Sequence, residues 1–406
     1  MSMQLATEPM AFKFFLLFLV SSLALVSVVL KEQLRGKLKV FRFTQPWLPL
    51  VVIQAGFLFM VWKQGIVRSD AHIWQFFCYV PLAAWFLFPV MRKKASQVMY
   101  GSLMVLNLLL MVFAIKSFYP GFLVQVPERM WTNTRDGLHG LFKPSASMNE
   151  LKIMLEEKGS SLPKKHPLLA QVGERTVDMV GDHQGLVILS GLKYQPRPVF
   201  QNYVANNAYL QDLNREYWGA GQTPEAVVQR MDAIDGTLST QADSQTILHL
   251  LSHYSLEADE GNTVLLAKKE VGSPVERLST KDYALRFEES VDIESFESAF
   301  LLARMKLPLN VLGHLRAFLY KPPLVHMRAE LEDGTSKEFR LNPVTVEREI
   351  LFAPAVENAS ELWLFRHGKE LPRVVKITLH IDSGEAVYFG RNLSFTISSF
   401  RWLDTE

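Results

Sequence analysis

VMYGSLMVLNLLLMVFAI, residues 98–115, is an uncharged run of nearly the length that crosses a membrane. A helix needs about 20 mostly apolar residues to cross a hydrocarbon core of about 30 Å. Three comparable runs precede it, at residues 11–30, 47–62 and 73–91. Four such runs in succession, joined by short basic connectors, predict a four-helix transmembrane region in residues 1–118.

The charge of the chain changes sign where this run ends. Residues 1–118 hold 12 Lys and Arg against 3 Asp and Glu, whereas residues 119–406 hold 31 against 38. The positive-inside rule places the basic connectors Lys31–Arg42 and Arg92–Lys94 in the cytoplasm, so both termini are expected outside it. The acidic balance of the second part argues against nucleic acid as a partner. The single cysteine, Cys78, excludes an intramolecular disulfide framework.

The part after residue 118 is predicted to hold three segments. Residues 119–167 are expected to form a helical juxtamembrane connector that ends in a turn-rich stretch. Residues 168–270 alternate short strands with helices of 8–13 residues, which indicates a small, mainly parallel α/β sheet. Residues 271–406 contain several short strands, among them 315–320, and an Asp-Gly hairpin signal at 333–334, which predicts a jelly-roll-like β-sandwich.

The densest polar cluster follows the predicted strand 176–180. Asp178, Asp182 and His183 are candidates for acid/base catalysis, because open α/β sheets bind ligands at the carboxyl ends of their strands. Arg197 is a candidate for binding an anion. A purely structural role, in capping helices and pairing across the sheet edge, is the alternative for all of these residues.

Two further residues are candidates for ligand binding. Asp235 lies in the acidic turn 231–236, where turn formation and helix capping are the alternative. Trp363 is one of several aromatic residues that could stack on sugars, or else pack in the sandwich core.

Known cofactor motifs are missing from the chain. His249 and His253 have zinc-ligand spacing, but Leu250 stands where HExxH has its glutamate. No P-loop, GxSxG or GxGxxG occurs, so neither a metal nor a cofactor is expected.

The stretch RPVFQNY at 197–203, followed by YLQDLN at 209–214, is the basis of a resemblance to a known group of proteins. With Val177-Asp178 upstream and residues 234–236 downstream, it resembles a little-characterised group of bacterial multi-pass membrane proteins. Those look related to the extracytoplasmic parts of polytopic glycosyltransferase-like proteins. The resemblance implies a location in the bacterial inner membrane. Proteins of that type carry an acid in an early extracytoplasmic loop, and Asp70 is the acid of the second loop here, which makes it a further catalytic candidate.

These observations favour a membrane-anchored binding or assembly protein of the cell envelope. Its expected partners are the lipid bilayer and an envelope glycan or another membrane protein. The alternatives are a membrane enzyme acting on lipid-linked sugars and, third, a transporter subunit. Clustered acids around a wet cleft would favour the enzyme, and an exposed apolar or aromatic patch would favour binding.

Overall fold

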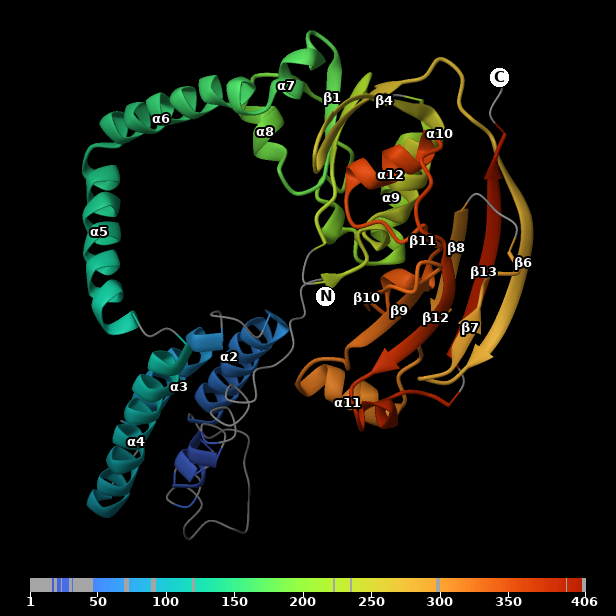
Figure 1. The fold of residues 1–406 in the computed structure, drawn as a ribbon. Coiled ribbons are helices and arrows are strands. Elements are labelled where there is room, and N and C mark those ends of the chain that lie inside the picture. Colours follow the sequence, from blue (N-terminus) through green and yellow to red (C-terminus); the bar gives the residue numbers. More distant parts are fainter. Residues whose placement is uncertain are drawn as a thin grey trace. The chain divides into compact units, whose positions relative to one another are not determined.

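A computed structural model describes residues 17, 20–22, 24–28, 31, 47–68, 73–88, 93–118, 121–221, 223–233, 236–296, 300–391 and 393–403 (Figure 1). The chain divides into two compact units. The smaller unit lies within Met3–Pro144 and includes Phe318–Lys321, and the larger unit contains Ser145–Ala317 and Pro322–Glu406.

The smaller unit is helical where it is described. Buried apolar side chains of its helices, among them Trp62, Phe77 and Ala114, form a small core of their own. Its labelled helices are α2 (Trp47–Arg68), α3 (Ile73–Leu87), α4 (Lys94–Phe118) and α5 (Phe122–Phe142).

The prediction of four membrane-spanning helices is wrong. Among the described residues, one helical stretch, Lys94–Ser117 of α4, is long and apolar enough to cross a membrane. Helix α3 has 15 residues, which rise about 22 Å and fall short of the hydrocarbon core. The run at 11–30 and the connector 32–42 lie largely outside the described residues. A single apolar helix also occurs in the cores of soluble proteins, so α4 alone does not define a membrane protein.

The larger unit begins with helices and then forms a mixed five-stranded sheet. Its strand order is β2-β1-β3-β5-β4, in which β1 pairs with β2 and β3 in parallel, and β5 pairs with β3 and β4 antiparallel. Half of the pairings are therefore antiparallel, not mainly parallel as the sequence predicted. The strands are β1 (Thr176–Val180), β2 (Lys193–Tyr194), β3 (Ala226–Arg230), β4 (Tyr254–Glu260) and β5 (Thr263–Lys268).

Helices connect and cover these strands. Asn207 caps α9, because its side-chain oxygen accepts a hydrogen bond from the backbone N–H of Leu210 at 3.0 Å. The helices of this part are α6 (Pro144–Lys165), α7 (Pro167–Val172), α8 (Gln184–Leu189), α9 (Ala208–Gly219) and α10 (Ser244–His253), with short 3₁₀ turns η2 (Asn202–Val204) and η4 (Ser239–Gln241).

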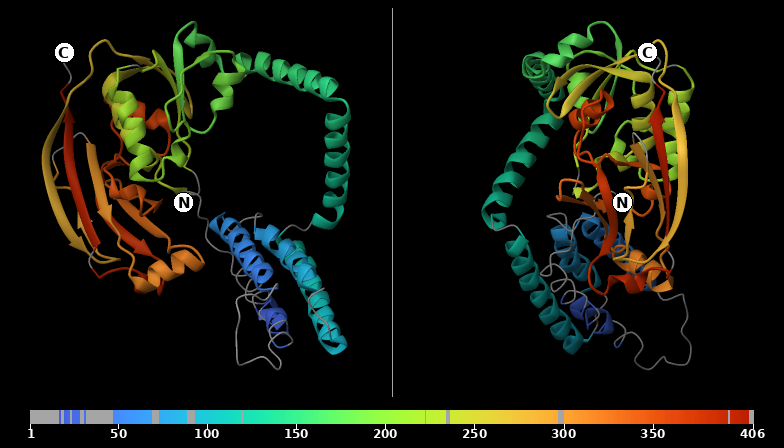
Figure 2. Two further views of the ribbon diagram at one scale, coloured as in Figure 1. Left: turned by 180° about the vertical axis from the view of Figure 1, so that it is seen from behind. Right: turned by 45° about the vertical axis from the view of Figure 1, so that its right-hand side comes forward.

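The C-terminal part is rich in strands, which are grouped together in both views of Figure 2. Two antiparallel sheets, β10-β9-β12-β7 and β11-β8-β13-β6, bury apolar side chains of both in one core. The strands are β6 (Val275–Leu285), β7 (Ser290–Asp292), β8 (Phe300–Lys306), β9 (Val325–Leu331), β10 (Ser336–Leu341), β11 (Ile350–Ala353), β12 (Val374–Ile381) and β13 (Leu393–Trp402).

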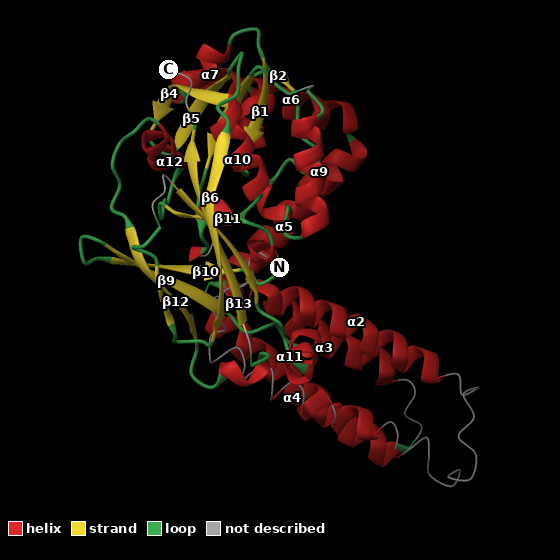
Figure 3. Cartoon of the chain, turned by 90° about the vertical axis from the view of Figure 1, so that its right-hand side faces the viewer, coloured by secondary structure: helices red, strands yellow, loops and turns green. Residues whose placement is uncertain are grey.

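Two helices interrupt these strands, α11 (Val311–Leu319) and α12 (Ala359–Arg366) (Figure 3). The strand predicted at 315–320 is wrong, because this stretch belongs largely to α11. Its apolar residues Leu312, Leu315 and Leu319 recur at intervals of three and four, which is the period of a helix. The remaining short turns are η5 (Thr345–Glu347) and η6 (Glu385–Tyr388).

A second core joins the five-stranded sheet to the β-rich part. Val227 and Ile247 of the first pack in one cluster with Leu302 and Trp363 of the second. The indole N–H of Trp363 donates to Oε1 of Gln229 at 2.7 Å inside this core. Both parts therefore belong to one folded body.

Gln241 joins the two parts by polar contacts. Its side-chain Nε2 donates to the carbonyl of Arg340 at 2.9 Å, and its Oε1 accepts from the backbone N–H of Asn342 at 3.0 Å. Only 3% of Gln241 is exposed, so water does not replace these bonds.

Gln241→Leu is expected to lower the free energy of unfolding of the larger unit by about 2–4 kcal/mol, because two buried backbone groups lose their partner. Urea unfolding of the full chain measures the change. Gln171→Leu, at an exposed position of α7, is the control and should stay within about 0.5 kcal/mol of the parent. Equal stability of the two variants would contradict the role given to Gln241.

Candidate functional site

Strands β1 and β3 are neighbours in the sheet, and the order of the strands reverses between them. After β1 the chain passes through α8 to β2 on one side, and then through α9 to β3 on the other side. Open α/β sheets bind ligands outside the carboxyl ends of such a strand pair. Residues 181–183 and 231–232 follow these two strand ends.

Gly181 allows the two strand ends to approach each other closely. A Cβ atom at this position would lie 2.8 Å from the carbonyl oxygen of Arg230 at the end of β3. The side chain of Gln184 supports the turn, donating to the carbonyls of Gly181 at 2.9 Å and Phe200 at 2.7 Å. A side chain at residue 181 would therefore force the strand ends apart.

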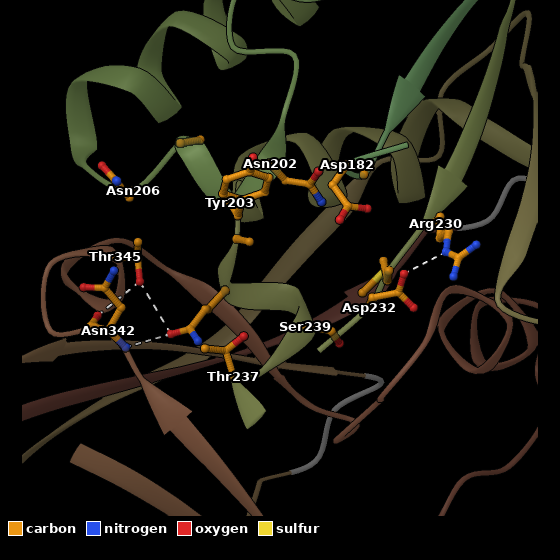
Figure 4. A pocket seen from close by; sticks show the side chains of 15 residues that line it. Asp182, Asn202, Tyr203, Asn206, Arg230, Asp232, Thr237, Ser239, Asn342 and Thr345 are labelled. Carbon is orange, nitrogen blue, oxygen red and sulfur yellow. Dashed lines mark hydrogen bonds and ion pairs between the residues drawn. The ribbon is translucent and has the colours of Figure 1, made fainter. Parts of the chain in front are cut away.

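A pocket lies at these strand ends (Figure 4) and encloses about 620 Å³, part of which is open to solvent. One side is formed by Asp182 after β1, Asp232 after β3, and Asn202 and Tyr203 of η2. The amide of Asn202 points toward Asp182 in Figure 4.

The β-rich part supplies another side of the pocket. Asn342 and Thr345 follow β10, and they contact Gln241, which also lines the pocket. Oε1 of Gln241 accepts from Oγ1 of Thr345 at 3.5 Å as well as from the backbone of Asn342. The pocket is thus assembled from segments about 160 residues apart in the sequence.

Two side-chain amides in the pocket wall each have one atom without a hydrogen-bond partner among the described residues. Oδ1 of Asn202 and Nδ2 of Asn342 are enclosed and have no partner among the described residues. Each residue is only 9% exposed. Because buried polar groups are nearly always paired, an unpaired acceptor and an unpaired donor beside one pocket indicate a polar occupant.

Two carboxylates and an imidazole gather at the strand ends. Asp182, His183 and Asp232 each offer one ligand atom, and these atoms lie within 4.8 Å of one another. Nδ1 of His183 is hydrogen-bonded to Oδ1 of Asp182. Oδ2 of Asp232 accepts from Nε of Arg230 at 2.7 Å, and its Oδ1 accepts from the amide of Asn262. The side chains of Asp182 and Asp232 are each 34% exposed, so both are accessible to a ligand.

Beneath the pocket, Arg197 is enclosed between two carboxylates. Its Nη1 lies 2.8 Å from Oδ2 of Asp178, and its Nε lies 3.3 Å from Oδ2 of Asp243. All three side chains are 0% exposed. Asn214 donates to the same oxygen of Asp243 at 2.7 Å. These contacts fix β1, the segment before η2 and the start of α10 relative to one another.

Burial perturbs the ionisation of this group. It raises the pKa of the Asp243 carboxyl, although Arg197 and the hydrogen bonds from Thr246 and Asn214 act against that rise. Burial alone would lower the pKa of Arg197, but Asp178 and Asp243 hold it above its usual value. The guanidinium therefore stays charged and serves as the shared partner of both carboxylates.

Arg197→Met is expected to lower the free energy of unfolding by about 3–5 kcal/mol, because it leaves buried carboxylates without their counter-charge. Urea unfolding checks this value. The matched control is Arg401→Met, which breaks the more exposed pair with Glu276 at 2.6 Å and should cost about 0–1 kcal/mol. If both variants lost the same small amount, the buried group would not have the structural role argued for it.

The candidate residues from the sequence fall in different places. Asp182 lines the pocket and His183 is hydrogen-bonded to it, whereas Asp178 and Arg197 meet in a separate buried group. Trp363 is 0% exposed inside the shared core. Asp70 and Asp235 lie outside the described residues.

Several residues of the pocket were not among the candidates from the sequence. Asp232 could have been found, because it lies in the same acidic turn, 231–236, as the candidate Asp235. Asn202 and Tyr203 belong to the stretch RPVFQNY but had no role assigned to them. Asn342 has no local signal, because only the packing of the β-rich part brings it to the pocket.

The histidines of HLLSH stack on each other instead of converging on a common point. The ring centroids of His249 and His253 lie 4.1 Å apart, with 9° between the planes. Trp218 stacks on His249 at 5.1 Å. Burial first, and then the charges of His253 and Lys268, lower the pKa of His249 to about 4.

The lowered pKa of His249 predicts a loss of stability in acid. The unfolded chain binds a proton at His249 near the ordinary pKa of about 6.5, whereas the folded chain does so only near 4. The contribution of His249 is therefore complete above pH 6.5 and is lost as the pH falls toward 4. Urea unfolding at several pH values should show a smaller acid loss for His249→Gln than for the parent. His314→Gln, an exposed control, should behave as the parent, and a parent-like acid loss in His249→Gln would contradict the prediction.

No family model matches the chain, and no curated protein or solved structure matches it either.

Proposed function

We propose that this protein binds a small polyhydroxylated ligand, a saccharide or the end of a glycan, in the pocket at the ends of β1 and β3. The observation that carries the proposal is a pair of enclosed amide atoms without partners among the described residues, Oδ1 of Asn202 and Nδ2 of Asn342. A hydroxyl group both donates and accepts a hydrogen bond, so a saccharide offers partners to both amides.

The rest of the pocket wall supports this chemistry. Carboxylates such as Asp182 and Asp232 accept hydrogen bonds from hydroxyl groups, and Tyr203 adds an aromatic ring to the wall. Gln241 and Thr345 are already bonded within the protein, which keeps that side of the pocket in place. Preorganised polar groups in a mostly apolar concavity are typical of small-molecule sites.

An enzyme acting on sugars is the second candidate. It is favoured by the position of Asp182 and Asp232 at neighbouring strand ends, where two carboxylates could serve as acid and base. The enclosure of Asp178 by Arg197 argues against Asp178 as the catalytic acid, because no substrate reaches it.

The cellular setting is part of the proposal. An envelope location, with a glycan as the occupant of the pocket, follows from the resemblance carried by RPVFQNY. Among the described residues, α4 is the helix that could anchor such a protein in a lipid bilayer.

A glycan array probed with the labelled full chain tests the proposal, followed by calorimetric titration of the best monosaccharide or oligosaccharide found. Asn202→Ala and Asn342→Ala should each weaken binding about two- to tenfold, the effect of one lost hydrogen bond. The control is Asn133→Ala on the exposed surface of α5, which should bind as the parent does. Saccharide binding would be refuted if no glycan bound, or if both pocket variants kept the parent affinity.

A further inference from the structure

We propose that Asp182, His183 and Asp232, together with the amide of Asn202, bind a divalent transition-metal ion. The inference rests on the pocket being the functional site, as proposed above, but not on a saccharide being its occupant. It starts from the cluster of three ligand atoms within 4.8 Å of one another. Two atoms bound to one metal at about 2.0–2.2 Å lie at most about 4.4 Å apart. Small rotations of these partly exposed side chains therefore bring them to bonding distance.

The hydrogen bonds around Asp232 orient it and leave room for a cation. Arg230 and Asn262 each occupy one lone pair, on different oxygens of the carboxylate. Each carboxylate oxygen has two lone pairs, so one on each oxygen remains for a metal. Partners of this kind commonly hold ligating carboxylates in metal sites. Asp182 and Asp232 together outweigh the charge of Arg230, which leaves a net negative charge to attract a cation.

The pairing of Asp182 with His183 places two ligand atoms side by side. Nδ1 of His183 and Oδ1 of Asp182 are hydrogen-bonded to each other. A metal bound by both atoms would replace the proton that they share, so the imidazole would bind in its neutral form through Nδ1.

Asn202 is an independent observation in favour of a ligand here. Its side chain is 9% exposed, its Oδ1 has no hydrogen-bond partner among the described residues, and the amide points toward Asp182 (Figure 4). Rotation of the amide by half a turn presents Oδ1 to the cluster. Amide oxygens are common ligands of divalent cations.

The chemical nature of the ligand atoms indicates which class of metal would bind. Mg²⁺ and Ca²⁺ take oxygen ligands, whereas an imidazole beside two carboxylates suits Zn²⁺, Fe²⁺ or Mn²⁺. A metal in this position would lie at the wall of the pocket beside Asn202. There it could bind hydroxyl or phosphate oxygens of an occupant, or lower the pKa of a bound water.

Calorimetric titration of MnCl₂ and ZnCl₂ into the full chain, stripped with EDTA and carrying no histidine tag, tests the inference. One saturable site is expected for at least one of the two ions, with much weaker binding of CaCl₂. Asp182→Asn, His183→Gln and Asp232→Asn should each weaken the affinity at least about tenfold. Glu276→Gln, which removes a carboxylate paired to Arg401 far from the cluster in sequence, is the control and should leave the affinity unchanged.

Absence of saturable binding to the parent, or parent affinity in all three cluster variants, would overturn the metal site. Thermal unfolding in EDTA shows which variants are folded. If Asp232→Asn is unstable because Arg230 loses its partner, the variants of Asp182 and His183 decide the question. Titration of the metal without saccharide, and of saccharide in EDTA, separates the two proposals. Saccharide binding without metal binding would refute only the metal site, and the reverse result would refute only the saccharide.

Discussion

A guanidinium group without access to water can persist only if its charge is balanced. Asp178 of β1 and Asp243 before α10 balance the charge of Arg197 and accept hydrogen bonds from its Nη1 and Nε. Asp243 has left-handed backbone angles, φ 56° and ψ 47°, a conformation that aspartate tolerates better than most residues. The position of three chain segments is therefore set by one buried charge. Since residues adjoining these segments in the sequence line the pocket, its shape depends on the same contact.

The pocket also depends on how the β-rich part is joined to the five-stranded sheet. The segment 239–244 carries a series of side chains that donate to backbone carbonyls of the β-rich part, among them Ser239 to Val356 at 3.0 Å and Ser244 to Glu349 at 2.8 Å. Each such bond is worth only about 1 kcal/mol. Several of them, acting with the shared apolar core, give a boundary at which Asn342 is held beside Gln241. A ligand bound there would touch both parts at once.

Local patterns in the sequence predicted the individual elements better than the architecture. The strand predicted at 176–180 matches β1, because its apolar residues and turn signals act over a few neighbours. The length of the apolar runs alone gave a wrong prediction of membrane-spanning helices in residues 47–91, because α3 is too short to span a membrane. Asp178 and Asp182 look alike in the sequence, yet one is buried against Arg197 and the other opens into the pocket. That difference arises from contacts with residues 19 and 50 positions away, at Arg197 and Asp232, which no local pattern reports.

Among the described strands, β6 lies at one edge of its sheet, where it pairs with β13 alone, and it exposes most of its 11 residues. An edge of that length presents unpaired backbone groups to any other extended chain. Here it carries Glu276, Arg277, Lys281 and Asp282, and charged side chains on an edge strand oppose the addition of a further strand. The exposed edge of the β-rich part therefore carries its own barrier to self-association.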